Sequence, residues 1–113
     1  MNPSTPQVDV GDLAPRVAGG APLIDVREPN EYDEVHAAGA RLVPLGSVVD
    51  SFEVLLRELP AGQPWYVICR SGARSMRAAT WLREQGADAV NVAGGTDAWV
   101  AAGLPTASGP AGS

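Results

Sequence analysis

Short apolar segments alternate along this chain with stretches of helical pattern, and this alternation constrains the fold more than any other feature. The apolar segments predict strands at residues 7–10, 22–26, 41–45, 65–69 and 89–92. Strands that alternate with helices usually form a parallel sheet. The segments at 23–24 and 65–68 lack an apolar/polar alternation, as expected for central strands covered on both faces. The sequence therefore predicts an α/β fold built on a parallel sheet.

Helical stretches separate these strands, and glycine or proline ends most of them. We expect helices at 11–18, 75–85 and 96–102, a turn or short helix at 30–36, and another helix that begins at Ser47 or Asp50 and ends at Leu59. The length of 113 residues fits one domain. We expect this domain to span 8–105, after a flexible N-terminus at 1–7. The segment 106–113 is rich in Gly, Ala, Ser and Pro, which favours a disordered tail.

The composition excludes several classes of partner. The chain has a net charge of −5 and contains no lysine, so it offers no basic tract for nucleic acid or an anionic membrane. No segment approaches the roughly 20 apolar residues of a membrane span, and the first residues do not resemble a signal peptide. A single cysteine forms no internal disulfide, and one cysteine with one histidine cannot build a tetrahedral zinc site alone. These features favour a metal-free protein of the reducing cytoplasm.

The single cysteine, Cys69, ends a predicted central strand and begins a short polar segment that leads into a helix. We call residues 69–75 the Cys69 loop. Ligands of open α/β sheets bind at the carboxyl ends of the strands. Inward N–H groups, the helix dipole and the nearby Arg70 and Arg74 would favour a thiolate, since such surroundings lower a cysteine pKa from near 8.5 to roughly 3.5–7.5. A buried structural cysteine is the alternative, but the polar loop favours a nucleophile.

The sequence of the Cys69 loop, Cys-Arg-Ser-Gly-Ala-Arg-Ser, resembles the active-site loop of rhodanese-domain sulfurtransferases. The resemblance covers nearly all of residues 8–105. Its other segments are Leu-Ile-Asp-Val-Arg-Glu-Pro at 23–29, Glu-Tyr at 31–32, His36, Gly-Ala at 39–40, Pro-Leu at 44–45, Ala-Gly-Gly at 93–95, Ala-Trp at 98–99 and Gly-Leu-Pro at 103–105. It implies a single three-layer α/β/α domain with a five-stranded parallel sheet.

The resemblance also implies a reaction. Cys69 would take the outer sulfur of thiosulfate, or of a related persulfide donor, and pass it to cyanide, a thiol or a sulfur-carrier protein. The substrate-binding residues would be those of the loop: Arg70, Ser71, Gly72, Ala73, Arg74 and Ser75. The two arginines would hold the thiosulfate dianion, because guanidinium groups suit oxyanions. No cofactor is needed, and we expect a monomer or weak dimer.

Two more polar residues, Asp25 and Arg27, follow another predicted central strand and therefore reach the same edge of the sheet as Cys69. They are candidates for the rim of the site. The alternative is structural: Asp25 would accept backbone N–H groups, and Arg27 would pair with Glu28 or Glu31. His36 lies in a segment that departs from the family pattern Gly-His-Ile-Pro-Gly-Ala, and for it we favour a structural hydrogen bond over catalysis.

The sequence leaves two alternatives to sulfur transfer. A non-catalytic rhodanese-like interaction module is one, although the intact Cys69 loop argues against it. A cysteine phosphatase or arsenate reductase is another. Only four residues separate Cys69 from Arg74, whereas those enzymes wrap a tetrahedral oxyanion with a longer loop. Arsenate reduction would also call for a second cysteine, and the chain has one.

Overall fold

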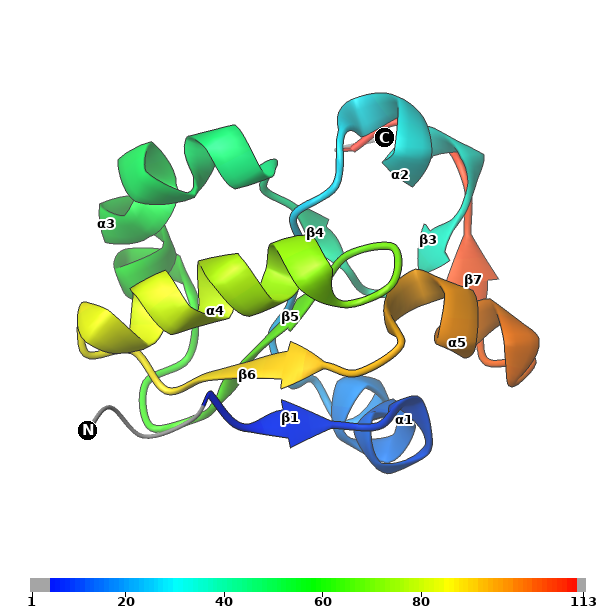
Figure 1. Cartoon of the computed structure of the whole chain (residues 1–113), viewed down its shortest axis with the longest axis horizontal. Helices are drawn as coiled ribbons and strands as arrows, with labels where there is room; N and C mark the ends of the chain where they lie inside the picture. The colour runs from blue at the N-terminus through cyan, green and yellow to red at the C-terminus, as the bar shows by residue number, and fades with distance from the viewer. Residues whose placement is uncertain (1–4, 112–113) are drawn as a thin grey trace.

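Five parallel strands form the centre of the computed structural model, which describes residues 5–111. They are β1 (Gln7–Val8), β2 (Leu23–Asp25), β4 (Arg41–Leu42), β5 (Trp65–Ile68) and β6 (Ala89–Val92). Their order is β1-β6-β5-β2-β4, so that β5 is central (Figure 1). In the middle of the sheet, Val67 of β5 lies opposite Ile24 of β2 on one side and Asn91 of β6 on the other. The predicted five-stranded parallel sheet is confirmed.

Helices cover both faces of this sheet (Figure 1). They are α1 (Val10–Ala18), α2 (Pro29–Glu34), α3 (Val48–Glu58), α4 (Ala73–Glu84) and α5 (Gly95–Ala101), with a 3₁₀ turn, η1 (Leu45–Ser47), before α3. Trp65 and Val67 of β5 pack in one apolar core with α3 and α4. The alternate residues, Tyr66 and Ile68, pack in a second core with α1, α2 and α5. The three-layer arrangement is therefore confirmed.

Some element boundaries differ from those predicted. The strand expected at 7–10 is shorter, because the side chain of Asp9 caps α1 by accepting the N–H of Asp12 at 2.8 Å. The turn or short helix expected at 30–36 ends at Glu34, because Val35 has extended backbone angles and His36 belongs to strand β3 (His36–Ala37). A β-branched residue such as Val35 favours this extended conformation. None of the helices in residues 5–111 is long and apolar enough to cross a membrane.

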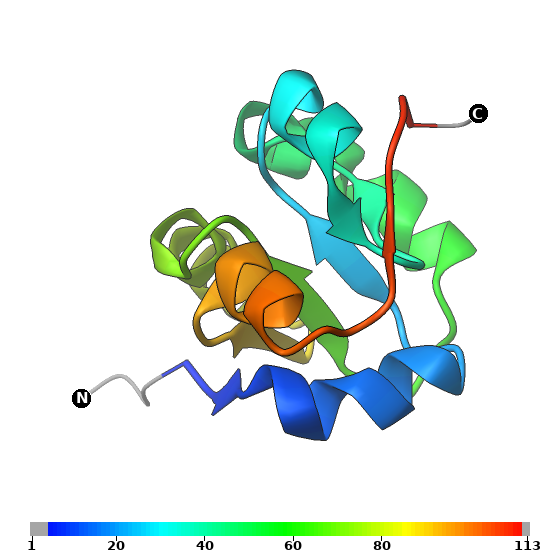
Figure 2. The same ribbon diagram turned by 90° about the vertical axis from the view of Figure 1, so that its right-hand side faces the viewer.

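The C-terminal segment differs most from its prediction. A disordered tail was expected from residue 106, but strand β7 (Thr106–Ala107) pairs antiparallel with β3. Figure 2 shows this segment, in red, running beside the part of the chain that holds α2 and β3. Trp99 fixes its start, because its Nε1 donates to the carbonyl of Pro105 at 2.7 Å. Backbone pairing of this kind leaves little trace in composition. The remaining ends, 1–4 and 112–113, lie outside the described residues.

Candidate functional site

The Cys69 loop lies at the carboxyl edge of the sheet, where β5 ends and α4 begins. Cys69 follows Ile68, the last residue of β5, and Ile68 lies opposite Asp25, the last residue of β2. The chain then turns at Gly72, whose φ of 116° is in the left-handed region that favours glycine. This short turn directs the first amides of α4 back toward the cysteine.

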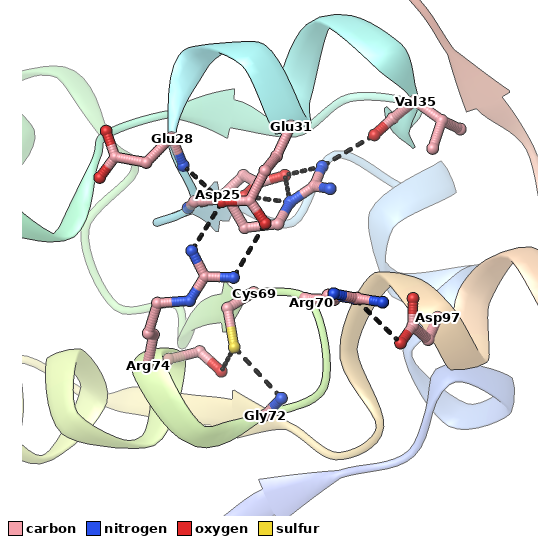
Figure 3. Close-up of polar contacts among 11 residues, drawn as sticks. Asp25, Glu28, Glu31, Val35, Cys69, Arg70, Gly72, Arg74 and Asp97 are labelled. Carbon is pink, nitrogen blue, oxygen red and sulfur yellow. Dashed lines mark hydrogen bonds and ion pairs between the residues drawn. The ribbon is translucent and has the colours of Figure 1, made fainter.

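The thiol of Cys69 is buried and surrounded by hydrogen-bond donors (Figure 3). The N–H of Gly72 donates to Sγ at 3.1 Å, and the hydroxyl of Ser75 approaches Sγ at 3.2 Å. Burial is the largest single influence on the Cys69 pKa and raises it. The hydroxyl of Ser75 and the backbone N–H groups of Ser75, Gly72 and Ser71 together outweigh it, so the pKa of Cys69 is lowered. The loop therefore stabilises the thiolate.

Ser75 also connects the thiol to the neighbouring strand β6. Its Oγ lies 2.6 Å from Oδ1 of Asn91, and Nδ2 of Asn91 donates to the side chain of Gln7 at 2.9 Å. A hydroxyl carries one proton, so Ser75 donates to Asn91 or to Cys69 but not to both at once. Sequence reasoning missed Asn91. The available signal was an amide side chain within an otherwise apolar strand segment.

The outer side of the Cys69 loop is held by α5. The N–H of Thr96 donates to the Cys69 carbonyl at 2.8 Å, and that of Asp97 donates to the Arg70 carbonyl at 3.0 Å. Gly95 allows this contact, because a Cβ placed there would lie 2.5 Å from the Cys69 oxygen. Its φ of 58° is also unfavourable for other residues. These bonds hold the loop carbonyls outward while its N–H groups face the sulfur.

Arg74 extends from the first turn of α4 toward α2, where it meets Glu31 (Figure 3). Its two terminal nitrogens donate to the two carboxylate oxygens at 2.7 and 2.9 Å. The hydrogen bonds from Arg74 are the main reason that the pKa of Glu31 falls to about 2. The sequence suggested Arg74 as a binding group for an anion, but its guanidinium already has a carboxylate partner. Arg70 is exposed and lies 3.6 Å from Asp97.

The two rim candidates form a buried pair with each other. The guanidinium of Arg27 donates to both carboxylate oxygens of Asp25, at 2.8 to 3.2 Å, and to the carbonyl of Val35 at 2.8 Å. The N–H of Arg27 donates to Asp25 as well. The expectation that Arg27 pairs with Glu28 or Glu31 is therefore wrong. The closer carboxylate is that of Asp25, which ends β2 beside the turn carrying Arg27.

His36 has a structural environment. Its Nδ1 lies 2.7 Å from the carbonyl oxygen of Tyr32, and its ring stacks on the Tyr32 ring at 3.5 Å between centroids. The predicted structural hydrogen bond is confirmed. Within residues 5–111, no three His, Cys, Asp or Glu side chains are grouped in a way that would hold a metal ion. The polar groups that the structure gathers around the Cys69 sulfur are hydrogen-bond donors.

Comparison with known proteins identifies similar domains and relatives. The model of the rhodanese-like domain matches residues 9–102. An Allochromatium vinosum protein named sulfurtransferase is 32% identical over 102 residues, which cover 88% of this chain and 92% of that protein. The Bacillus subtilis protein YqhL is 40% identical over 80 residues, 70% of this chain and 60% of that protein. A Mycobacterium tuberculosis protein, the probable adenylyltransferase/sulfurtransferase MoeZ, is 42% identical over 78 residues, 68% of this chain but 19% of MoeZ.

Solved structures with a similar fold agree with these sequence comparisons. The rhodanese-related protein of Thermoplasma volcanium has a TM-score of 0.80 and 26% identity, with 90% of this chain and 97% of that chain covered. Thiosulfate sulfurtransferase from Pseudomonas aeruginosa has a TM-score of 0.80 and 27% identity, with 96% of this chain and 20% of that chain covered. Since the family model spans most of the sequence and solved rhodanese-related proteins share its fold, this chain belongs to the rhodanese-like domain family.

Proposed function

We propose that this protein transfers sulfane sulfur through a persulfide on Cys69. The observation that carries the proposal is the buried thiol, which the N–H of Gly72 and the hydroxyl of Ser75 surround at hydrogen-bond distance. A persulfide is an anion near neutral pH, and the same donors would stabilise it. Relatives named sulfurtransferase and, in Bacillus subtilis, putative sulfur carrier protein support this class of reaction.

The reaction has two half-reactions. In the first, the Cys69 thiolate attacks the outer sulfur of thiosulfate or of a related persulfide donor. With thiosulfate, the S–S bond of the donor breaks and sulfite leaves with the electron pair. In the second, the outer sulfur of the persulfide passes to cyanide, a thiol or a sulfur-carrier protein, and the Cys69 thiolate is regenerated. The reducing cytoplasm would keep the free thiol available.

The charge arrangement suggests how the donor is held. Arg74 is engaged by Glu31, and Arg70 is exposed and only loosely associated with Asp97. The hydroxyl of Ser75 and the inward N–H groups of Ser71, Gly72 and Ser75 are therefore the principal anion-binding groups in this proposal. The arginines add a field around them. Substrate binding by the loop residues 70–75 would thus depend on the backbone geometry of the loop and on the Ser75 hydroxyl more than on the arginines.

Intact-protein mass spectrometry tests the proposal directly. The reduced protein is measured before and after addition of thiosulfate, and again after cyanide. We expect a gain of one sulfur atom that cyanide removes. The Cys69→Ser variant should retain its circular dichroism spectrum and gain no sulfur.

If neither thiosulfate, mercaptopyruvate nor a small-molecule persulfide adds sulfur to the folded protein, the proposal is refuted. A non-catalytic interaction module would then be the better interpretation. Hydrolysis of a small phosphate ester by the same preparation would instead favour a cysteine phosphatase.

A further inference from the structure

A pocket of about 440 Å³ lies beside the Cys69 loop, between α2 and α5. The side chains that matter for its chemistry are Arg27, Glu31, Glu34, Arg70, Thr96 and Asp97. We propose that this pocket binds the sulfur acceptor, and that the acceptor is a small thiol that carries an ammonium group. This inference rests on the proposed sulfur transfer and adds the acceptor class to it.

The pocket adjoins the Cys69 loop through Arg70, while Cys69 itself is not among the lining residues. Thr96 lines it, and the N–H of Thr96 is bonded to the carbonyl of Cys69 at 2.8 Å. Arg70, which also lines it, is the next residue after Cys69. Glu31 forms another part of the wall and contacts Arg74 of the same loop (Figure 3). A small molecule in the pocket therefore lies next to the loop that would carry the persulfide.

The hydroxyl of Thr96 is the first indication of a ligand. The residue is 3% exposed, and Oγ1 is the only buried side-chain nitrogen or oxygen in residues 5–111 that lacks a hydrogen-bond partner. Buried hydroxyl groups are normally satisfied, because leaving one unpaired is unfavourable. Oγ1 is covered in this structure, so a polar group of a ligand in the pocket would supply the missing partner once the Thr96 side chain rotates toward it.

The charges indicate which ligand is favoured. Each guanidinium near the pocket already faces a carboxylate: Arg27 faces Asp25, Arg74 faces Glu31 and Arg70 faces Asp97. In contrast, no side chain of residues 5–111 pairs with the carboxylate of Glu34, which is exposed at the pocket wall. A persulfide on Cys69 would add a second negative charge. The surroundings therefore attract a cation and disfavour another anion.

An ammonium-bearing thiol fits both features. Its ammonium group would interact with Glu34, and its N–H donors suit an oxygen acceptor such as Thr96 Oγ1. Its thiolate would attack the outer sulfur of the Cys69 persulfide. The S–S bond at Cys69 then breaks, the electron pair returns to Sγ, and the acceptor leaves as a persulfide. No other oxidant or reductant is required.

The test compares thiols on protein that has first been loaded with sulfur from thiosulfate and checked by mass. Loss of sulfur is timed with 2-aminoethanethiol, with neutral 2-mercaptoethanol and with anionic 3-mercaptopropionate. Comparing rate ratios between variants cancels the intrinsic reactivity of each thiol. The variants are Glu34→Gln, Thr96→Val and, as a matched control, Glu53→Gln, which changes an exposed carboxylate on α3 away from the pocket.

We expect Glu34→Gln to lower the ratio of the rates with 2-aminoethanethiol and 2-mercaptoethanol by about two- to fivefold, as for an exposed ion pair. Thr96→Val should slow the reaction with 2-aminoethanethiol while its melting temperature stays equal or rises, because the free protein loses no hydrogen bond. Glu53→Gln should match the wild type in every ratio.

Two results would overturn the acceptor pocket and leave the proposed function standing. One is a Glu34→Gln variant whose ratio of rates with 2-aminoethanethiol and 2-mercaptoethanol equals that of the wild type. The other is a Thr96→Val variant that is less stable but reacts equally fast with 2-aminoethanethiol. Failure of wild-type protein to load sulfur from any donor refutes the proposed function, and the acceptor pocket with it.

Discussion

Replacing Glu31 with glutamine should destabilise the protein in a way that depends on pH. The carboxylate accepts two hydrogen bonds from Arg74 that join α2 to the first turn of α4. Both side chains are partly shielded, with 26% and 34% of their surface exposed. Glutamine keeps the size of the side chain and removes its charge. The change therefore tests the ion pair more than the packing around it.

The magnitude follows from the pKa of Glu31, which lies at about 2 instead of 4.5. At about 1.4 kcal/mol per pKa unit, this difference corresponds to about 3–4 kcal/mol of stabilisation before screening. Solvent screening reduces the value for groups as exposed as these, so we expect a loss of about 1–2 kcal/mol at pH 7. Because the folded-state pKa is lowered, the stabilisation is present above pH 4.5 and disappears as the pH falls toward 2.

Urea unfolding of the wild type and of Glu31→Gln at pH 7, 4 and 3 measures this pH-dependent loss of stability. The difference in the free energy of unfolding should be largest at pH 7 and shrink steadily below pH 4.5. Glu58→Gln is the control, because Glu58 forms an ion pair with Arg41 in which both side chains are about half exposed. Its effect should be close to zero. A Glu31→Gln penalty of equal size at pH 7 and pH 3 would mean that charge is not its origin.

Three further predictions concern the loop and its supports. Ser75→Ala removes a hydroxyl that donates to the Cys69 thiolate, so the pKa of Cys69 should rise. The pH profile of Cys69 alkylation by iodoacetamide should then move to higher pH. An unmoved profile would contradict the role of the Ser75 hydroxyl in stabilising the thiolate. Gly95→Ala should lower the melting temperature far more than Gly86→Ala. A Cβ at Gly95 would lie 2.5 Å from a backbone atom, whereas a Cβ at Gly86 would meet nothing within 4 Å. Equal decreases in melting temperature would mean that α5 moves aside freely. Arg27→Leu leaves a buried carboxylate unpaired and should cost about 3–5 kcal/mol in urea unfolding at pH 7, and a loss below about 1 kcal/mol would show that water reaches that carboxylate.

The strands and the Cys69 loop were predictable because their signals are local. The four apolar residues Trp65–Ile68 end where polarity begins, and both the strand and the turn follow from that contrast. The N–H groups around Cys69 could also be anticipated, since a strand that turns directly into a helix brings them together. Local pattern therefore accounts for the sheet and for the centre of the candidate site.

Long-range pairing was not predictable in the same way. Arg74 and Glu31 are 43 residues apart, and nothing near either one indicates the partner. The same is true of Asn91, which reaches Ser75 across a strand-helix contact. Two-residue β7 was missed because its pairing with β3 uses backbone groups, which every sequence has. These features depend on how elements are arranged in space.

The bonds from Thr96 and Asp97 to the carbonyls of Cys69 and Arg70 have a consequence for how this site can diversify. They fix the orientation of the loop peptides from outside, so the N–H groups that lower the Cys69 pKa together with the Ser75 hydroxyl are held in place whatever side chains stand at Arg70 and Ala73. In the proposed sulfur transfer, those two side chains could then change to suit a different donor or acceptor without disturbing the groups that bind the sulfur. The proposed reactivity of Cys69 therefore depends on α5, which carries no nucleophile, as well as on the turn after β5 that carries the cysteine.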